Sequence, residues 1–240
     1  MNAKVSFLSL MVIGGLVLLA ATRTGSVAVA PVVVKPSQEL AVVLRSQEAL
    51  SEPSQRSAPV ALLPALRPIT EEQTVLPVIG HMTGPDGLSW LHVMLPGRPN
   101  GRMGWISQRA TAYKVTGWHI VVNTSSRRVT VYRHSRIVRV FRAIVGKPWT
   151  PTPQGEFFVE EAVELRPNEA GAPYALALSA RSNVLQEFAG GPGQIALHGV
   201  SNLGGVLGTA VSHGCVRLST DAISWLGTRI GPGVPVTITS

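Results

Sequence analysis

From about residue 74 onward, short runs of apolar and β-branched residues alternate with clusters of polar, Gly and Pro residues. Runs of this length are typical of strands, and the clusters between them are typical of turns. The pattern predicts strands at residues 75–79, 90–95, 104–106, 118–122, 129–132, 137–141, 174–179 and 194–198. The chain is therefore expected to be mainly β.

One longer helical pattern follows residue 218. Ser219 or Thr220 is suited to its N-cap and Gly231 to its end. Its apolar positions, at helical spacing, are Ile223, Leu226 and Ile230. Two shorter helices are predicted at residues 37–50 and 182–188. We expect a mixed β-sandwich or barrel-like domain with one substantial helix near its end.

The first 30 residues resemble an export signal. Lys4 supplies a positive start, and Phe7 to Ala21 is an uncharged apolar run of fifteen residues. A membrane-spanning helix needs roughly 20 apolar residues, which favours a cleaved signal while leaving a retained anchor open. Either outcome predicts a protein that works outside the cytoplasm, with possible membrane attachment through its N-terminus.

Three segments are predicted beyond residue 30. Residues 31–73 contain many prolines among small and polar residues, which is typical of a semi-extended linker. Residues 74–114 are rich in hairpin signals, and the pattern of Trp, a turn and then Gly104-Trp105-Ile106 resembles small bacterial Src-homology-type barrels. A β-extension packed on the main domain is the alternative. Residues 116–240 form the principal domain.

Charge is distributed unevenly along the chain. The net charge is +8, and seven basic residues with no acidic one lie between residues 115 and 155. Residues 156–169 reverse the sign, with five acids. A basic surface outside the cell favours an anionic partner such as the cell wall or lipid headgroups, although solvated strand faces would give the same pattern. Nucleic acid is not expected, because export argues against it and basic residues are not interleaved with aromatic ones.

The strongest chemical signal is Ser212-His213-Gly214-Cys215-Val216-Arg217, which contains the single cysteine. An exported chain with one cysteine cannot form an internal disulfide, so the thiol is either a buried apolar group or a reagent. In extended backbone His213 and Cys215 share a face, and Gly214 permits a tight turn. A second histidine pair, His198-Gly199, follows an apolar run upstream. The combination is typical of an activated cysteine nucleophile.

These residues, in their order along the chain, resemble the YkuD family of L,D-transpeptidase catalytic domains. The resemblance covers residues 117–239 and includes the Thr-Pro-x-Gly-x-Phe turn at 152–157, Ala-Leu-His-Gly at 196–199 and Ser-His-Gly-Cys-Val-Arg-Leu at 212–218. It implies that Cys215 is the nucleophile and His198 the proton carrier. The remaining implied site residues are Gly199, whose carbonyl orients the imidazole; His213, which flanks the thiol; Ser212 and Arg217 at the substrate; and Tyr174 at the donor site. Arg217 could equally brace a loop.

The chemistry of such a site leads to specific expectations. His198 would take the thiol proton to give an ion pair, and the N–H groups of Gly214 and Cys215 would bind the oxyanion. The interval from His198 to Ser212 predicts a short, Gly-rich rim over the cleft, with Gly204, Gly205 and Gly208.

The resemblance also implies the substrate. A tetrapeptide stem of peptidoglycan would acylate Cys215 with loss of D-alanine, and an amine of a neighbouring stem would resolve the thioester as a 3→3 cross-link. Carbapenems would acylate the same thiol, and no cofactor or metal ion is implied. Alternatives are an L,D-carboxypeptidase, a lipoprotein-anchoring acyltransferase, a non-catalytic wall-binding module, or a zinc site at His198, His213 and Cys215.

Overall fold

The computed structural model describes residues 32–188 and 190–240. The predicted signal peptide or membrane anchor at residues 1–30 lies outside these residues. Within the described part of the chain, no helix has the length and apolar character needed to span a bilayer.

The N-terminal β region, residues 38–116, is one antiparallel sheet with strand order β3-β2-β6-β5-β4-β1-β7. Its elements are β1 (Gln38–Val43), β2 (Gln47–Leu50), β3 (Pro59–Leu63), β4 (Val75–Thr83), β5 (Ser89–Met94), β6 (Met103–Ser107), the 3₁₀ helix η1 (Gln108–Ala110) and β7 (Thr111–Thr116). The strands predicted at 75–79, 90–95 and 104–106 are confirmed. Its likeness to a Src-homology-type barrel stays a prediction.

The prediction of a proline-rich linker at residues 31–73 is wrong, because β1, β2 and β3 lie within it. Pro59 occupies the first residue of the edge strand β3, where its missing N–H costs no internal ladder bond. Pro53, Pro64 and Pro68 lie outside the strands. The predicted helix at 37–50 is also absent, because β1 is paired on one side by β4 and on the other by β7.

The C-terminal β region begins at β8 and contains an eight-stranded sheet with the order β10-β9-β8-β17-β12-β13-β14-β16. Its strands are β8 (Trp118–Asn123), β9 (Arg128–Arg133), β10 (Arg136–Arg142), β12 (Gly155–Glu164), β13 (Tyr174–Arg181), β14 (Gln194–Gly199), β16 (Val216–Leu218) and β17 (Pro235–Thr239), and a separate parallel pair is formed by β11 (Val145–Gly146) and β15 (Ala210–Ser212). The strands predicted at 118–122, 129–132, 137–141, 174–179 and 194–198 are confirmed. The mainly β fold class is confirmed as well.

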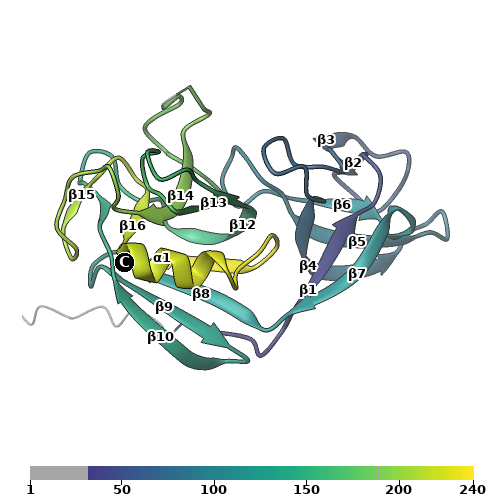
Figure 1. Cartoon of the computed structure of the whole chain (residues 1–240). Coiled ribbons are helices and arrows are strands. Elements are labelled where there is room, and N and C mark those ends of the chain that lie inside the picture. The colour runs from purple at the N-terminus through teal and green to yellow at the C-terminus, as the bar shows by residue number, and fades with distance from the viewer. Residues whose placement is uncertain (1–31, 189) are drawn as a thin grey trace, which may run out of the picture. The chain divides into compact units, whose positions relative to one another are not determined.

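Helix α1 (Thr220–Gly227) lies between the β8–β10 and β12–β16 parts of this sheet (Figure 1). The Ser219 hydroxyl accepts a hydrogen bond from the Ala222 N–H and caps the helix as predicted. Ile223 and Leu226 are fully buried in the core. The helix ends earlier than predicted, at Gly227 rather than at Gly231. The helix predicted at 182–188 does not form.

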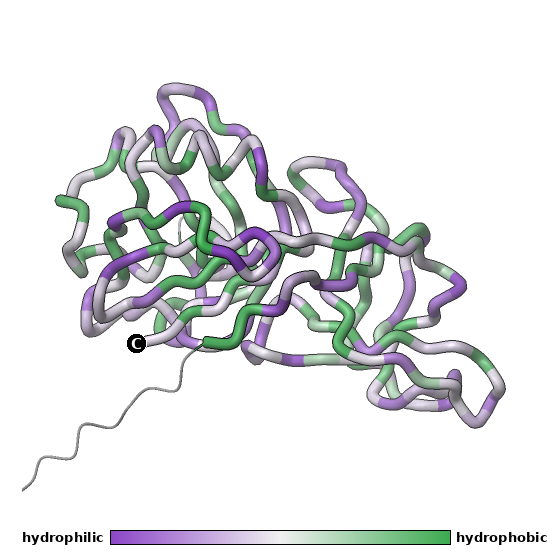
Figure 2. Tube along the Cα trace, turned by 90° about the horizontal axis from the view of Figure 1, so that it is seen from below, coloured by the Kyte–Doolittle hydropathy of each residue, from purple (hydrophilic) through white to green (hydrophobic). Residues whose placement is uncertain are grey.

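Hydrophobic and hydrophilic positions alternate along the trace through both β regions (Figure 2). Strand β12 differs, because residues 157–161 are all buried and its two faces meet two cores. Phe157 packs with Ile120 and Leu176 in the C-terminal core, whereas its neighbour Phe158 packs with Leu76 and Val93 in the N-terminal core. Successive strand residues point to opposite faces, so one strand contributes to both cores. Residues 33–240 accordingly form one compact unit.

Buried charges join the same two regions. Arg67 pairs with Glu160, and its Nε donates to Glu161 at 3.1 Å. Arg181 Nη1 donates to the other oxygen of Glu160 at 2.8 Å. Both glutamates are 2% exposed, so removal of one partner would leave a charge in the interior without compensation. The acidic run at 156–169 therefore contains buried carboxylates and is not a solvated face throughout.

His119 on β8 provides a test of this packing. Burial lowers its pKa from 6.5 to about 4, and its Nε2 is 2.8 Å from the Thr237 hydroxyl, which donates to Glu156. Because the unfolded chain binds the proton more tightly, we expect His119 to remove about 3 kcal/mol from the unfolding free energy as pH falls from 6.5 to 4. Urea unfolding at the two pH values measures this, and His119→Gln should abolish that part of the difference. An unchanged pH dependence in this variant would contradict the assignment.

Candidate active site

The nucleophile loop joins β15 to β16 and ends at Cys215. Gly214 has φ +121°, and a Cβ there would meet Ile195 Cδ1 at 2.9 Å, so the turn requires glycine. Ser212 is 0% exposed, its hydroxyl donates to the Cys215 carbonyl at 2.6 Å, and it accepts the Gly214 N–H at 3.1 Å. The loop that carries the thiol is therefore held rigidly.

Two buried threonines support this loop from the segment before β12. The Thr152 hydroxyl donates to the Gly214 carbonyl at 2.8 Å and accepts the Gly146 N–H at 2.9 Å. The Thr150 hydroxyl donates to the Ser212 carbonyl at 3.3 Å. The Thr-Pro-Thr-Pro segment, which the sequence marks only as a rigid turn, thus braces the nucleophile loop.

His198 lies on β14 in a defined orientation. Its Nδ1 is 2.8 Å from the Gly199 carbonyl, so Nδ1 carries the proton and Nε2 remains a base. Gly171, with φ +91°, packs against the ring, and a Cβ there would lie 2.6 Å from Nδ1. The backbone therefore selects both the tautomer and the ring position.

Cys215 directly precedes β16, and His198 lies on the neighbouring strand β14. β14 pairs with β16 in parallel, with His198 opposite Arg217. The Cys215 thiol donates to the Gln194 carbonyl over 4.0 Å, so it lies against the start of β14. Successive residues of β14 alternate, with Ile195 and Leu197 in the core and His198 on the opposite face. The register continues from Leu197 opposite Val216 to Ala196 beside Cys215, so His198 lies two residues further along β14 on the face that Cys215 shares.

The pKa shifts favour uncharged partners. Burial raises the pKa of the Cys215 thiol, against weaker lowering by a hydrogen bond from Ala196 and by the charge of Arg217. Burial also lowers the pKa of His198, with Arg217 acting in the same direction and the Gly199 hydrogen bond opposing it. Both shifts favour neutral thiol and neutral imidazole in the resting site, and the thiolate–imidazolium pair stays a prediction.

A narrow cavity of about 10 Å³ lies beside the thiol. The covering segment, defined as residues 182–188 and 190–194, supplies most of its wall, with Leu185 and Phe188 as the large side chains. His213 completes the wall, stacked on Phe188 with ring centroids 5.2 Å apart. The predicted rim at residues 204–208 does not line this pocket. Access to Cys215 is thus controlled by a segment that the sequence suggested to be helical.

His213 is exposed and lies on the pocket wall. Its Nε2 is 3.2 Å from the Lys147 ammonium. This ammonium donates to the ring nitrogen that would otherwise accept a proton from substrate. His213 flanks the thiol as expected, whereas its contacts assign the imidazole to the pocket entrance.

Arg217 braces the loop after β14. Its Nη1 donates to the Gly204 carbonyl at 2.6 Å, and its backbone exchanges hydrogen bonds with Ile144. Its Nε is buried and has no hydrogen-bond partner among the described residues. Of its two predicted roles, the observed contacts match the structural one.

Three sequence-based assignments do not match the geometry. Tyr174 packs on Gly227 of α1, on the face opposite His198, so its prediction as a donor-site residue is wrong. Ser212 is wholly occupied by the nucleophile loop and cannot contact substrate. The Gly214 N–H is bound to Ser212, so it is not an oxyanion donor. The Cys215 N–H has no acceptor among residues 32–188 and 190–240, which leaves it available for that role.

No group of three or more His, Cys, Asp or Glu side chains suited to a metal ion occurs among the described residues. In particular, His198 Nδ1 is engaged by the Gly199 carbonyl and His213 Nε2 by Lys147. The thiol and the two histidines are therefore arranged differently from the zinc site considered above.

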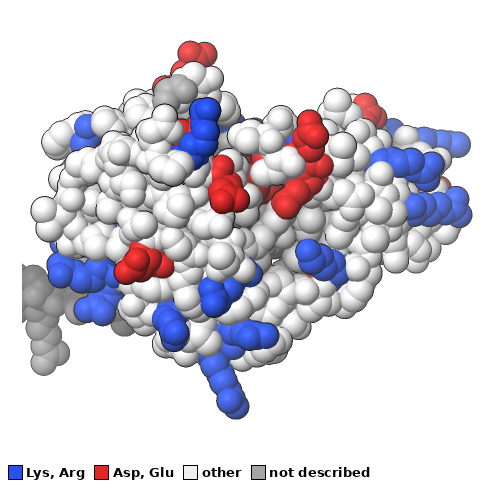
Figure 3. All heavy atoms as spheres, viewed as in Figure 1, with Lys and Arg blue, Asp and Glu red and all other residues white. Residues whose placement is uncertain are grey.

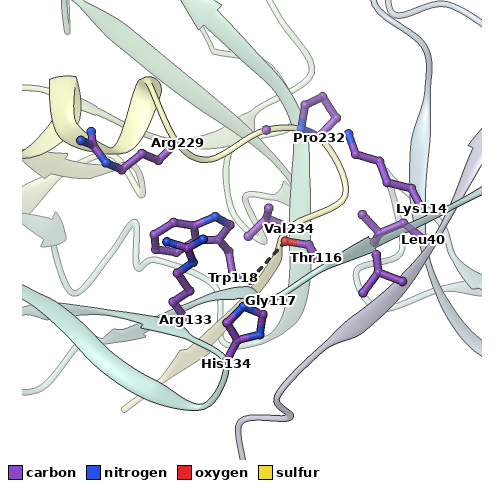
Figure 4. Close-up of a pocket in the computed structure, with 12 residues that line it drawn as sticks. Leu40, Lys114, Thr116, Gly117, Trp118, Arg133, His134, Arg229, Pro232 and Val234 are labelled. Carbon is purple, nitrogen blue, oxygen red and sulfur yellow. Dashed lines mark hydrogen bonds between the residues drawn. The ribbon is translucent and has the colours of Figure 1, made fainter.

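A second pocket, of about 280 Å³ and open to solvent, lies where β7 and β8 meet the loop after α1 (Figure 4). It is lined by Lys114, Arg133, His134 and Arg229, and by no acidic residue. The Arg133 guanidinium lies over the Trp118 ring, 5.2 Å from its centroid. The pocket shares no residue with the one at Cys215, and its cationic lining suits an anionic group.

The model of the YkuD family, described as the L,D-transpeptidase catalytic domain, matches residues 117–238, just over half of the chain. The protein of Bacillus licheniformis that carries the name L,D-transpeptidase YkuD is 31% identical over 124 residues, which are 51% of this chain and 66% of that protein. L,D-transpeptidase 1 of Mycobacterium tuberculosis is 28% identical over 130 residues, 49% of each protein.

Among solved structures, an L,D-transpeptidase from Mycobacterium tuberculosis H37Rv aligns at 19% identity over 70% of this chain and 90% of that chain, with a TM-score of 0.45. The match to the curated relatives spans from half to just under two thirds of their length. The family match includes the nucleophile loop, the histidine strand and the turn that braces them. The chain therefore belongs to the YkuD family, and residues 117–238 are its L,D-transpeptidase catalytic domain.

Proposed function

We propose that this protein is a peptidoglycan L,D-transpeptidase that forms 3→3 cross-links through a thioester on Cys215. The observations that carry the proposal are a thiol on the wall of a small cavity and, on the neighbouring strand β14, an imidazole whose Nδ1 is bound to the Gly199 carbonyl, which leaves Nε2 as a base. Membership of the YkuD family supplies the substrate class. The donor is a tetrapeptide stem, and the leaving group is its terminal D-alanine.

One base at His198 is sufficient for the proton transfers of both half-reactions, acylation of Cys215 and transfer of the acyl group to an amine. In acylation, His198 Nε2 takes the thiol proton as the sulfur attacks the carbonyl carbon of the third stem residue. The imidazolium then gives this proton to the departing D-alanine amine as the C–N bond breaks. In the second half, His198 takes a proton from the attacking side-chain amine and returns it to the thiolate as the C–S bond breaks. The Cys215 N–H would stabilise the oxyanion in each step.

The lowered pKa of His198 suits this order of proton transfers. A neutral imidazole at working pH is ready to accept the proton, and its conjugate acid is a strong enough acid to protonate the leaving amine. Because the pKa of Cys215 is raised by burial, the resting thiol keeps its proton and needs a base to remove it as the sulfur attacks.

The proposal is tested by incubating the purified protein with disaccharide tetrapeptides and resolving the products by mass. We expect free D-alanine and a dimer whose mass equals two monomers minus one D-alanine. A tripeptide monomer without dimer would indicate water as the acceptor and thus an L,D-carboxypeptidase. Unchanged substrate, with Cys215 reduced and the protein folded, would contradict the proposed function.

We also propose that a basic face binds anionic cell-wall polymer, which would place the enzyme outside the cytoplasm. This basic face consists of the exposed Arg133, Arg136 and Arg139, which the β9–β10 register places on one side of the hairpin, whereas the exposed Arg128 and Arg142 lie on its other side (Figure 3). None of the five forms an ion pair within the described part of the chain. Arg133 also lines the cationic pocket of Figure 4, so the arginines and the pocket together produce a positive electrostatic potential that attracts anions.

The double variant Arg136→Glu/Arg139→Glu should bind purified peptidoglycan sacculi severalfold more weakly than the wild type, in a pelleting assay at low salt. The control is Arg56→Glu/Arg109→Glu, which makes the same charge change on exposed residues of the N-terminal β region. Equal loss in both variants would indicate net charge alone, and no loss in either would exclude this face as the binding surface.

A further inference from the structure

We propose that Arg98, from the loop between β5 and β6, is a positioning residue for the pocket at Cys215. Its guanidinium donates to three backbone carbonyls of the covering segment: Nη1 to Pro192 at 2.8 Å, and Nη2 to both Ser182 and Leu185 at 2.9 Å. One side chain of the N-terminal β region thus links both ends of the segment that encloses the catalytic thiol.

The approach of Arg98 is built into the covering segment. Gly193 has φ +64°, and a Cβ there would lie 2.1 Å from the Leu185 carbonyl and 3.1 Å from Arg98 Nη2. Only glycine leaves space for the guanidinium between the two arms. The Ser182 hydroxyl accepts hydrogen bonds from the N–H groups of Val184 and Leu185. In this turn the Leu185 carbonyl accepts a hydrogen bond from Arg98 Nη2.

A second side chain of the same loop fixes the start of the covering segment. Asn100 Nδ2 donates to the Arg181 carbonyl at 2.8 Å, and Asn100 Oδ1 accepts the Arg181 N–H at 2.8 Å. Arg181 is in turn paired with the buried Glu160. The N-terminal β region therefore contacts the segment at its start and across both of its arms.

The segment makes few backbone bonds of its own. Ser182 N–H binds the Gly193 carbonyl, and Phe188 and Gly191 pair with each other. Three of its carbonyls depend on Arg98, and charge-assisted hydrogen bonds of this kind are among the stronger ones. Local opening is easiest where few such bonds hold a segment. Loss of Arg98 would therefore widen the space between Leu185, Phe188 and the thiol.

This inference deepens the proposed function, because it concerns the same thiol and the entry of the donor stem. Its test does not require turnover. The rates at which Cys215 reacts with iodoacetamide and with a bulky neutral maleimide are measured for wild type, Arg98→Ala and Arg98→Lys. The control is Arg109→Ala, an exposed arginine of the same region that makes no side-chain hydrogen bond within the described residues.

In Arg98→Ala the maleimide rate should rise about tenfold or more, as expected for loss of at least one charge-assisted hydrogen bond, while the small reagent changes less. Arg98→Lys, which reaches fewer carbonyls, should lie between Arg98→Ala and the wild type, and Arg109→Ala should match the wild type. With tetrapeptide donor, Arg98→Ala should raise KM more than it lowers kcat, because it loosens the pocket and leaves the reacting groups in place.

Equal maleimide rates in wild type and a folded Arg98→Ala would overturn the inference. If Arg98→Ala does not fold, Arg98→Lys decides, and a wild-type ratio of the two labelling rates in that variant would refute the role. If Arg98→Ala changes the labelling rates but the wild type forms no cross-linked dimer, Arg98 remains a positioning residue and the proposed function is rejected.

Discussion

Cys215→Ala should lower formation of cross-linked dimer by a factor on the order of 10⁶, the scale on which a hydrolase loses activity with its nucleophile. The physical reason is that the chain contains no other thiol to form the thioester. The measurement is the initial rate of dimer formation from disaccharide tetrapeptide. Acylation by a carbapenem, read as a mass increase of the protein, should vanish in parallel.

Cys215→Ser is the matched control for size and hydrogen bonding. The hydroxyl can donate to the Gln194 carbonyl as the thiol does. Its much higher pKa, together with the lowered basicity of His198, should nevertheless leave it nearly inactive. Thermal unfolding close to that of the wild type in both variants would attribute the loss to chemistry. Dimer formation by Cys215→Ala at a measurable fraction of the wild-type rate would contradict the assignment.

His198→Gln should slow acylation by about 10²- to 10⁴-fold, the range for loss of a general acid–base group. Glutamine can donate an amide hydrogen bond to the Gly199 carbonyl, so the backbone at residue 199 keeps a partner, but it carries no base. His213→Gln is the matched control, because that imidazole lies at the pocket wall beside Lys147. It should lose much less. An equal decrease of the acylation rate in both variants would contradict the assignment of proton transfer to His198.

The pH dependence of acylation carries the same information. Burial lowers the pKa of His198, so the imidazole stays neutral below pH 6.5, where a free histidine would be half protonated. The acylation rate should therefore be flat from neutral pH through 6.5 and fall only at more acidic pH, as the base becomes protonated. A rate that already halves at pH 6.5 or above would contradict a buried, neutral His198.

The chemistry of the site could be predicted from sequence because it is local. Ser212 to Arg217 contain the thiol and the glycine turn, and His198-Gly199 contains the base with its own orienting carbonyl. What could not be predicted is the state of these groups. The shifts of both pKa values follow from burial, which depends on side chains brought in from distant parts of the chain.

Strands with β-branched runs, such as β8 and β9, were predictable because their pattern matches a half-buried sheet. β12 was not, since its Glu160 and Glu161 resemble surface residues until their partner Arg67 is known, and this arginine lies 93 and 94 residues away. The covering segment shows the same limit. Leu185 and Phe188 have helical spacing, yet Arg98, 84 residues before Ser182, binds the carbonyls that a helix would use.

Two residue classes in the site were missed for a simpler reason. Gly171 and the threonines at 150 and 152 lie in Pro-containing turns, and such turns are first explained by chain reversal. The available signal was the repeated Thr-Pro pair directly before Gly155, since buried hydroxyls next to rigid prolines are suited to brace a loop. Contact of Gly171 with the His198 ring is visible only in three dimensions.

The covalent intermediate offers the most direct measurement. The protein is mixed with a disaccharide tetrapeptide in the absence of acceptor, quenched in acid, digested and mapped by mass spectrometry. The account predicts that the peptide containing residue 215 gains the mass of the donor minus D-alanine, through a thioester that hydroxylamine releases. A donor adduct on any other residue, or D-alanine release with no adduct when turnover is slowed by His198→Gln, would contradict it.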